Sequence, residues 1–107
     1  MESLLYFAED DTAANSGAIM PASRFLGMTL VDSTNVKLHF ASTINTTKQT
    51  TAAFGFTAGT FKEACQAIAG ALNSNTMTVV ADEANGVYLN YPGGSFNGVV
   101  AMDDETA

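Results

Sequence analysis

The chain has few of the side chains on which catalytic and metal sites most often depend. Cys65 is its only cysteine and His39 its only histidine, and tryptophan is absent. A single cysteine excludes an intramolecular disulfide framework. One Cys and one His leave a tetrahedral zinc site incomplete unless carboxylates or another subunit contribute. We therefore expect no metal site, no cofactor and no catalytic residue in this chain.

Basic residues are also scarce. Four of them, scattered without forming a stripe, stand against eleven acids, and the net charge is −7 at pH 7. A protein that binds nucleic acid gains affinity by neutralising phosphates with clustered Lys and Arg, and an anionic membrane surface attracts the same residues. The charge therefore predicts that neither nucleic acid nor a membrane is a partner. The four bases are Arg24, Lys37, Lys48 and Lys62.

Long apolar runs are missing as well. The longest are short, such as residues 77–81, and none approaches the roughly 20 apolar residues of a membrane-spanning helix. At the N-terminus, acids follow the first apolar residues and no basic region precedes them, which is unlike a secretory signal. The chain has 107 residues, of which 47% are hydrophobic. We expect a single domain over residues 1–107, with its own core.

The two ends of the chain lack the regular alternation of its middle. Residues 3–8 (SLLYFA) favour a strand or an extended arm, and residues 9–23 lack periodicity, which predicts a long loop. Together they make an N-terminal region over residues 1–24, consisting of the strand or arm and the loop. Residues 103–107 form an acidic tail, which we expect to fray.

In the middle of the chain, alternating apolar and polar residues predict antiparallel strands. Residues 25–31 and 36–40 flank turn-forming residues at 32–35, and together they indicate a hairpin. A Thr-rich third strand is expected around residues 46–54. The remaining strands are expected at residues 77–81, 87–91 and 98–102, with a turn at Asn85-Gly86.

One segment, GTFKEACQAIAGALNSN at residues 59–75, has helical periodicity instead. Thr60 and Glu63 form a capping-box pattern at its start. Gly70 inside it costs about 1 kcal/mol relative to Ala, which close packing against a neighbour would explain. The fold class is therefore α+β, a mainly antiparallel β-sheet with one amphipathic helix, over residues 60–73, packed on it. The apolar stripe of this helix comprises Phe61, Ala64, Cys65, Ile68, Ala69 and Leu72.

Three isolated features have both a chemical and a structural interpretation, and we favour the structural one for each. Cys65 lies on the apolar stripe, where a cysteine serves as a small hydrophobic residue. His39 shares the polar face of its strand with Lys37 and Ala41, and no motif supplies a catalytic partner for it. The sequence GGS at residues 93–95 is too short for a phosphate cradle and indicates a turn.

Acidic residues gather in three places, which are Glu9–Asp11, Asp82–Glu83 and Asp103–Glu105. We expect all three to lie in loops or at chain ends. Oxygen-rich loops can hold calcium, but the spacing of these acids matches no calcium-loop pattern. Solvated charge is the interpretation that we favour, and calcium binding stays open as the alternative.

Four segments together resemble a group of viral proteins. They are LYFAEDDTAANSGAIMPASRFLGM, VKLHFAS, TFKEACQAIAGALNS and TVVADEANGVYLN. Their shared elements are Asp10–Ala13 before a hairpin, a helix with Lys62–Ala69, and Val79–Asp82 after it. This arrangement is similar to that of small uncharacterised proteins of marine cyanophages, the tailed viruses of cyanobacteria. The resemblance covers most of the chain and implies a virion-associated or decoration protein, located in the virion or the host cytoplasm, and it supplies no catalytic residues.

Two functions fit these features. The first is a non-enzymatic viral structural or virion decoration protein that self-associates as a homo-oligomer, through strand edges or residues 3–8, and contacts other virion proteins. The second is a small acidic soluble binding module for a metal ion or a small ligand, which would use the acidic loops. A concave site lined by converging polar groups favours the second function, and a surface without one favours the first.

Overall fold

The described residues of the chain fold into two β-sheets, one α-helix and one short 3₁₀ helix. The computed structural model describes residues 2–9, 17–41 and 48–106, apart from the side chains of Lys48 and residues 104–106. Sheet A has the strand order β2-β1-β6-β7, and sheet B has the order β3-β4-β5-β9-β8. Sheet A consists of β1 (Leu4–Ala8), β2 (Gly17–Pro21), β6 (Met77–Asp82) and β7 (Val87–Tyr88). Sheet B consists of β3 (Phe25–Asp32), β4 (Asn35–Ala41), β5 (Lys48–Phe56), β8 (Asn90–Tyr91) and β9 (Gly94–Thr106).

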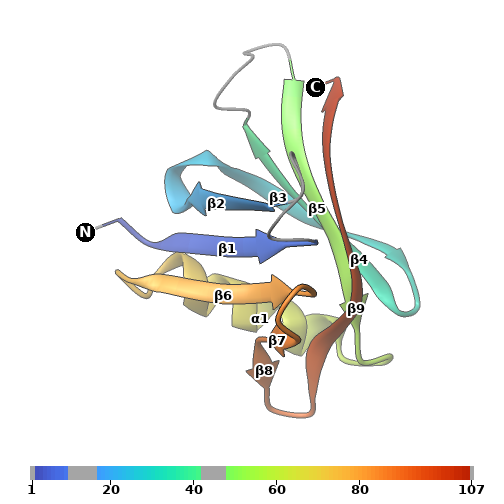
Figure 1. Cartoon of the computed structure of the whole chain (residues 1–107). Coiled ribbons are helices and arrows are strands. Elements are labelled where there is room, and N and C mark those ends of the chain that lie inside the picture. Colours follow the sequence, from blue (N-terminus) through green and yellow to red (C-terminus); the bar gives the residue numbers. More distant parts are fainter. Residues whose placement is uncertain (1, 10–16, 42–47, 107) are drawn as a thin grey trace.

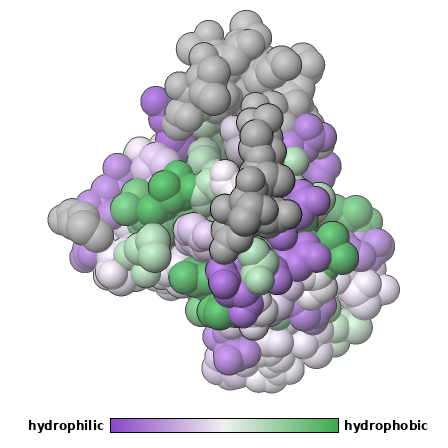
Figure 2. All heavy atoms as spheres, viewed as in Figure 1, coloured by the Kyte–Doolittle hydropathy of each residue, from purple (hydrophilic) through white to green (hydrophobic). Residues whose placement is uncertain are grey.

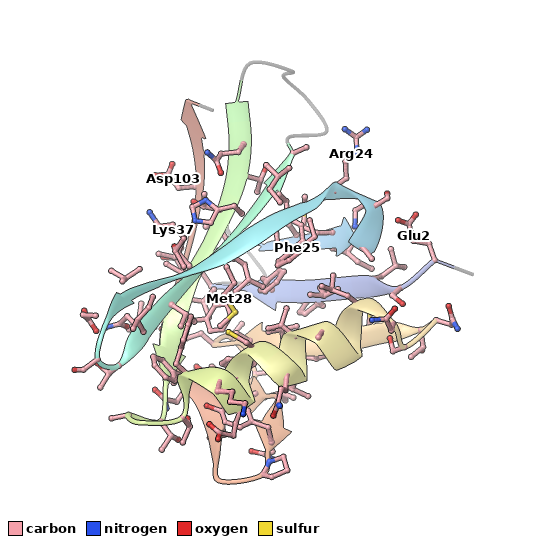
Figure 3. The ribbon with its side chains drawn as sticks, turned by 180° about the vertical axis from the view of Figure 1, so that it is seen from behind. Glu2, Arg24, Phe25, Met28, Lys37 and Asp103 are labelled. Atoms are coloured by element: carbon pink, nitrogen blue, oxygen red, sulfur yellow. The ribbon has the colours of Figure 1, made fainter. Side chains whose placement is uncertain are left out.

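The strands of the two sheets cross, and the helix α1 (Phe61–Leu72) lies behind sheet A (Figure 1). Seen from the opposite side, α1 runs along the sheet in front of β1 and β6 (Figure 3). β1 and β6 pair in parallel, whereas the other strand pairs of the described residues are antiparallel. The fold is therefore mostly antiparallel β-sheet with, in its described part, a single α-helix packed on it, as the sequence predicts.

The predicted hairpin at residues 25–40 is present. β3 and β4 pair from Phe25↔Phe40 to Asp32↔Asn35. The Asp32 carboxylate holds the turn, because its Oδ1 accepts hydrogen bonds from the backbone N of Thr34 and from Nδ2 of Asn35, each at 2.9 Å. A short acidic side chain that bonds to the backbone two residues later favours a turn at this position.

The predicted strand at residues 87–91 is divided between the two sheets. Its first part, β7, pairs with β6, and its second part, β8, pairs with β9. Leu89, which lies between them, donates its N–H to the carbonyl of Val80 and accepts a hydrogen bond from the N–H of Phe96. The chain thus passes from one sheet to the other while the backbone N–H and carbonyl of Leu89 keep hydrogen-bond partners.

Aromatic rings fill the core between the sheets. The ring centroid of Phe7 in β1 lies 5.7 Å from that of Phe40 and 5.9 Å from that of Phe54. The Phe54 and Phe96 centroids are 5.0 Å apart, with the rings nearly perpendicular at 86°. Edge-to-face pairs add attraction beyond the burial of their area. These contacts fix β1 against β4 and β5 of the other sheet.

Two N-terminal predictions need correction. Residues 3–8 are not an arm, because β1 lies between β2 and β6 in the chain's own sheet. The predicted loop 9–23 is wrong from residue 17 onward, since Gly17–Pro21 form β2 and Ala22–Arg24 form a short 3₁₀ helix. Residues 10–16 lie outside the described residues. β2 obtains its partner, β1, through the tertiary fold, and sequence periodicity does not report such pairing.

The last strand is longer than the predicted 98–102. β9 runs from Gly94 to Thr106, so the predicted frayed tail is wrong as far as Thr106, and residue 107 lies outside the described residues. Residues 103–106 pair with β5, which supplies the hydrogen-bond partners that a free tail lacks. Of the turn predicted at residues 93–95, only Gly93 lies in a turn, with a φ of 94°. The two residues after it already belong to β9.

The helix lies where the sequence predicts it, but its predicted capping box is wrong. Thr60 occupies the N-cap position and makes no side-chain capping hydrogen bond. Its hydroxyl instead donates to the carbonyl of Thr57 at 2.6 Å and lies 2.8 Å from the Tyr91 hydroxyl. The buried stripe also shifts, because Ala69 is exposed and Ala71 is buried in its place.

Candidate interaction surface

On the side away from α1, two neighbouring rows of the outer face of sheet A carry six apolar side chains, and Asp82, which pairs with Ala8, lies in the next row. Side chains alternate along a strand, and Leu5 and Phe7 of β1 point into the core, where both are fully buried. The residues between them point outward. Ile19 and Met77 are each 47% exposed, and the other four are half-buried. The six residues lie in two rows, each with one residue from β2, one from β1 and one from β6. The first row is Pro21, Leu4 and Met77, and the second is Ile19, Tyr6 and Val79.

The sequence explains why this face is apolar. β1 reads LLYFA, with an apolar residue at every position, so both of its faces are apolar. Such continuous runs are typical of strands covered on both faces, whereas a strand with one wet face alternates. β4 shows the second pattern, with Lys37 and His39 between buried residues. Figure 2 shows apolar residues gathered on the visible face over β1, β2 and β6. The signal was present in residues 3–8, but a strand assignment alone does not reveal it.

A shallow groove lies between α1 and β8. Its volume of about 300 Å³ is at the lower end for ligand pockets. Gly70 in its wall is exposed, and no atom of another element lies within 4 Å of the position of an added Cβ, so the expected close packing of this glycine is wrong. The Ser74 hydroxyl in the groove donates to the carbonyl of Ala71 at 2.9 Å and is thus already engaged. The lining residues are Ala67, Gly70, Ala71, Ser74, Thr78, Leu89, Asn90, Tyr91 and Pro92.

The expectation of solvated loop charge is wrong for Asp82 and Glu83. Asp82 is the last residue of β6 and is 6% exposed. Its carboxylate accepts hydrogen bonds from the backbone N of Asn85 at 3.2 Å and from Nδ2 of the same residue at 3.0 Å. The Glu83 Oε1 atom accepts a hydrogen bond from the N–H of Val100 at 2.9 Å. Both carboxylates therefore satisfy groups of the fold itself, as buried polar groups normally do.

Of the other two acidic groups, only Asp103–Glu105 differs from the prediction. Asp103–Glu105 lie within β9 rather than at a free end. Glu9 is exposed after β1, and Asp10 and Asp11 lie outside the described residues. Among the residues that the structure describes, no group of three or more His, Cys, Asp or Glu side chains is placed to hold a metal ion.

His39 belongs to a row of polar side chains on the outer face of sheet B. Its Nε2 atom lies 3.1 Å from Oγ1 of Thr29 on β3, and its Nδ1 atom lies 2.7 Å from Oε1 of Gln49 on β5. A carbonyl oxygen only accepts, so the Gln49 contact places the proton of the ring on Nδ1. The Thr29 hydroxyl, which can donate or accept, contacts Nε2, and the row joins three adjacent strands.

A hydroxyl, an imidazole and an amide in this order have the connectivity of a nucleophile, a base and an orienting group. Acyl transfer also needs donors that are placed in advance for the oxyanion, and a recess that holds the substrate. Thr29 is exposed on a sheet face and does not line the groove beside α1. We therefore interpret this row of side chains as hydrogen bonds that link three neighbouring strands.

Cys65 is half-buried on α1, and burial raises the pKa of its thiol. A nucleophilic cysteine needs the opposite, a lowered pKa with a base beside it. The direction of the shift fits the interpretation of Cys65 as a small hydrophobic residue of the helix.

The chain was compared with family models, curated proteins and solved structures. No family model, no curated protein and no solved structure matches this chain. Among the described residues, no helix is both long and apolar enough to span a membrane.

Proposed function

We propose that the chain is a non-enzymatic structural subunit that self-associates, of the virion or decoration type that its resemblance to cyanophage proteins implies. The observation that carries the proposal is the outer face of sheet A, where six apolar side chains lie together on a chain with a net charge of −7. Contiguous exposed apolar surface is typical of a contact with another molecule. Symmetric association of identical chains is the commonest form of such contacts.

The size of this face indicates how strong the contact is. Three strands of about five residues span roughly 14 Å by 17 Å, or about 240 Å². Stable complexes bury about 800 Å² on each partner. The outer face of sheet A alone therefore supports a weak contact. Such a contact becomes occupied where many copies are held close together, as they are in a particle.

In this proposal α1 is an amphipathic helix whose only task is to close the core. Ala64, Ile68 and Ala71 are buried, whereas Lys62 and Gln66 are exposed. The helix covers the face of sheet A that is opposite to the outer face. It thus leaves the apolar outer face available to a partner.

Sedimentation velocity from micromolar to millimolar concentration, at low and high salt, tests self-association. We expect the average mass to rise with concentration, and to rise further at high salt, because salt screens the repulsion between chains of charge −7. Ile19→Lys should weaken association, whereas Leu26→Lys, at a 61% exposed residue of β3, should not. A wild-type chain that stays monomeric at millimolar concentration in both salts overturns the proposal.

The groove beside α1, which no acidic residue lines, favours a small ligand rather than a metal ion. In the alternative function, a small acidic module, a metal ion would instead use the acidic loops. Calorimetric titration with calcium chloride separates the two functions. Saturable heat at micromolar calcium, from a chain that stays monomeric, would favour the module. Absence of heat from a chain that associates would favour the structural subunit.

A further inference from the structure

The chain contains two Asn-Gly pairs, Asn85-Gly86 in the turn after β6 and Asn97-Gly98 in β9. A glycine after an asparagine has no Cβ to hinder its backbone nitrogen, and this nitrogen can attack the carboxamide carbon of the asparagine side chain. We propose that the turn makes Asn85 a site of this spontaneous deamidation, whereas the sheet protects Asn97. The proposal concerns a covalent modification, so it goes beyond the proposed function and does not depend on it.

The reaction needs water as its only co-reactant. The backbone nitrogen of Gly86 bonds to Cγ of Asn85 and loses its proton, while the Cγ–Nδ2 bond breaks and the side-chain nitrogen leaves with that proton as ammonia. The cyclic imide that results then adds a water molecule at one of its two carbonyl carbons. Breakage of the bond from Cγ to the Gly86 nitrogen gives aspartate. Breakage of the original peptide bond gives isoaspartate instead, in which the backbone runs through Cγ.

The turn holds Asn85-Gly86 only loosely. Both residues are exposed, and apart from its chain neighbours no atom lies within 4 Å of a Cβ added to Gly86. The Gly86 N–H donates to the carbonyl of Glu83 at 3.4 Å, longer than the usual range of about 2.7–3.2 Å. Asn85 donates to the Asp82 carboxylate from its backbone N at 3.2 Å and from Nδ2 at 3.0 Å. Hydrogen bonds at an exposed turn open at little cost in free energy, so the Gly86 nitrogen can reach Cγ.

The second pair, Asn97-Gly98, is held from both sides. Asn97 pairs with Gly55 of β5, and its Oδ1 atom lies 2.5 Å from the position of a Cβ added to Gly55, so the carboxamide lies against β5. On the other side, the carbonyl of Gly98 accepts a hydrogen bond from the Tyr88 hydroxyl. This pair is exposed as well, so access of water does not distinguish the two sites. Ring closure here requires part of the β5–β9 pairing to open, which costs far more than the opening of an exposed turn.

Deamidation of Asn85 places a second carboxylate beside Asp82. Asp82 is 6% exposed, and the Nδ2 atom that donates to it is replaced by a charged oxygen that repels it. The turn lies beside β9 (Figure 1), whose backbone is bound by the side chains of Glu83 in the turn and Tyr88 after it. Loss of the bonds between Asp82 and Asn85 therefore loosens the link between sheets A and B.

The stability of two variants tests this consequence. Asn85→Asp imitates one product of the reaction, and Asn90→Asp adds the same charge at an exposed position of β8. We expect Asn85→Asp to unfold at a lower urea concentration than Asn90→Asp at neutral pH, because only the first variant sets two carboxylates against one another. Equal midpoints would overturn the consequence for the link between the sheets.

Ageing of the wild-type chain in mildly alkaline buffer, folded and in concentrated urea, tests the site itself. Peptide mapping by mass spectrometry gives the deamidation rate at each pair, and the rate in urea is the reference for each, since both pairs are followed by valine. Relative to this reference, we expect folding to slow Asn97 on the order of tenfold or more beyond Asn85, because paired strands open less often than a turn. Equal slowing at the two sites, a faster reaction at Asn97, or no reaction at Asn85 in the folded chain overturns the proposal.

Discussion

The backbone N–H of Val100 donates a hydrogen bond to the carboxylate of Glu83, with 2.9 Å between N and Oε1. Glu83 follows β6 of sheet A, and Val100 belongs to β9 of sheet B, so this bond joins the two sheets. The Tyr88 hydroxyl donates to the carbonyl of Gly98 close by. Side chains of the segment after β6 thus occupy part of the free edge of β9. This part of the edge is less open to a neighbouring strand than an unprotected edge would be.

Replacing the Glu83 carboxylate should weaken the link between the sheets. Glu83→Ala leaves the N–H of the fully buried Val100 without this acceptor. A buried donor without a partner costs about 1–3 kcal/mol of the free energy of unfolding. Glu83→Gln keeps an acceptor oxygen and should retain most of the stability. Urea unfolding of the two variants and of the wild type checks this. Midpoints of both variants equal to that of the wild type would show that the bond contributes nothing.

Gly55 of β5 is a position where even a methyl group should not fit. An added Cβ would lie 2.5 Å from Oδ1 and 3.0 Å from the backbone O of Asn97. The side chain can move, but the backbone oxygen is held by the pairing of β5 with β9. Gly55→Ala should therefore cost about 1–3 kcal/mol. Gly27→Ala on β3 is the matched control, because no atom beyond its two chain neighbours lies within 4 Å of its added Cβ. A Gly55→Ala melting temperature no lower than that of Gly27→Ala would contradict the prediction.

The parts of the fold that the sequence predicts correctly are those set by local chemistry. The β3–β4 turn depends on Asp32 bonding to residues two and three positions later, and α1 depends on its own periodicity. The errors lie where distant partners decide. β2 exists because β1 pairs with it, and residues 103–106 are in a strand because β5 pairs with them. A single sequence contains no direct signal for either pairing.

The candidate surface was predictable only in part for a related reason. The apolar run of β1 is visible in the sequence, but the row that contains Ile19, Tyr6 and Val79 combines three strands that are far apart in the chain. Asp82 and Glu83 illustrate the reverse case. Their sequence suggests solvated charge, and their hydrogen-bond partners, Asn85 and Val100, become evident only from the fold.

Acid should weaken the hairpin turn through Asp32. The hydrogen bond from the backbone N–H of Thr34, followed by that from the Asn35 side chain, lowers the pKa of the Asp32 carboxyl. A carboxyl whose pKa is lower in the folded state stabilises the fold above its unfolded pKa, and this contribution is lost as pH falls through the folded pKa. The urea midpoint should therefore fall between about pH 5 and pH 2.

Asp32→Asn provides the comparison, since it removes the titrating group from the turn. We expect this variant to unfold at a lower urea concentration than the wild type at pH 7, and the difference between the two midpoints to shrink toward pH 2. A difference that stays constant over this range would show that the Asp32 charge does not stabilise the turn.

The helix should contribute to stability through its buried side. Ile68 is 2% exposed, and Ile68→Ala should lower the free energy of unfolding by about 2–5 kcal/mol because it leaves a cavity. Gln66→Ala, at an exposed position of the same helix, should change it by less than about 0.5 kcal/mol. A thermal melt of Ile68→Ala that barely moves would remove α1 from the core.

Nucleic acid should not bind to this chain at physiological salt. Arg24, Lys37, Lys48 and Lys62 stand against eleven acids, and phosphates are repelled by a net charge of −7. Affinity for nucleic acid depends on the number of phosphates that bases neutralise, so a chain without a basic stripe lacks the main source of that affinity. A gel-shift assay with single- and double-stranded DNA at micromolar protein should show only free probe. A shifted band that weakens with added salt would contradict the prediction, because such salt dependence is the mark of phosphate contacts.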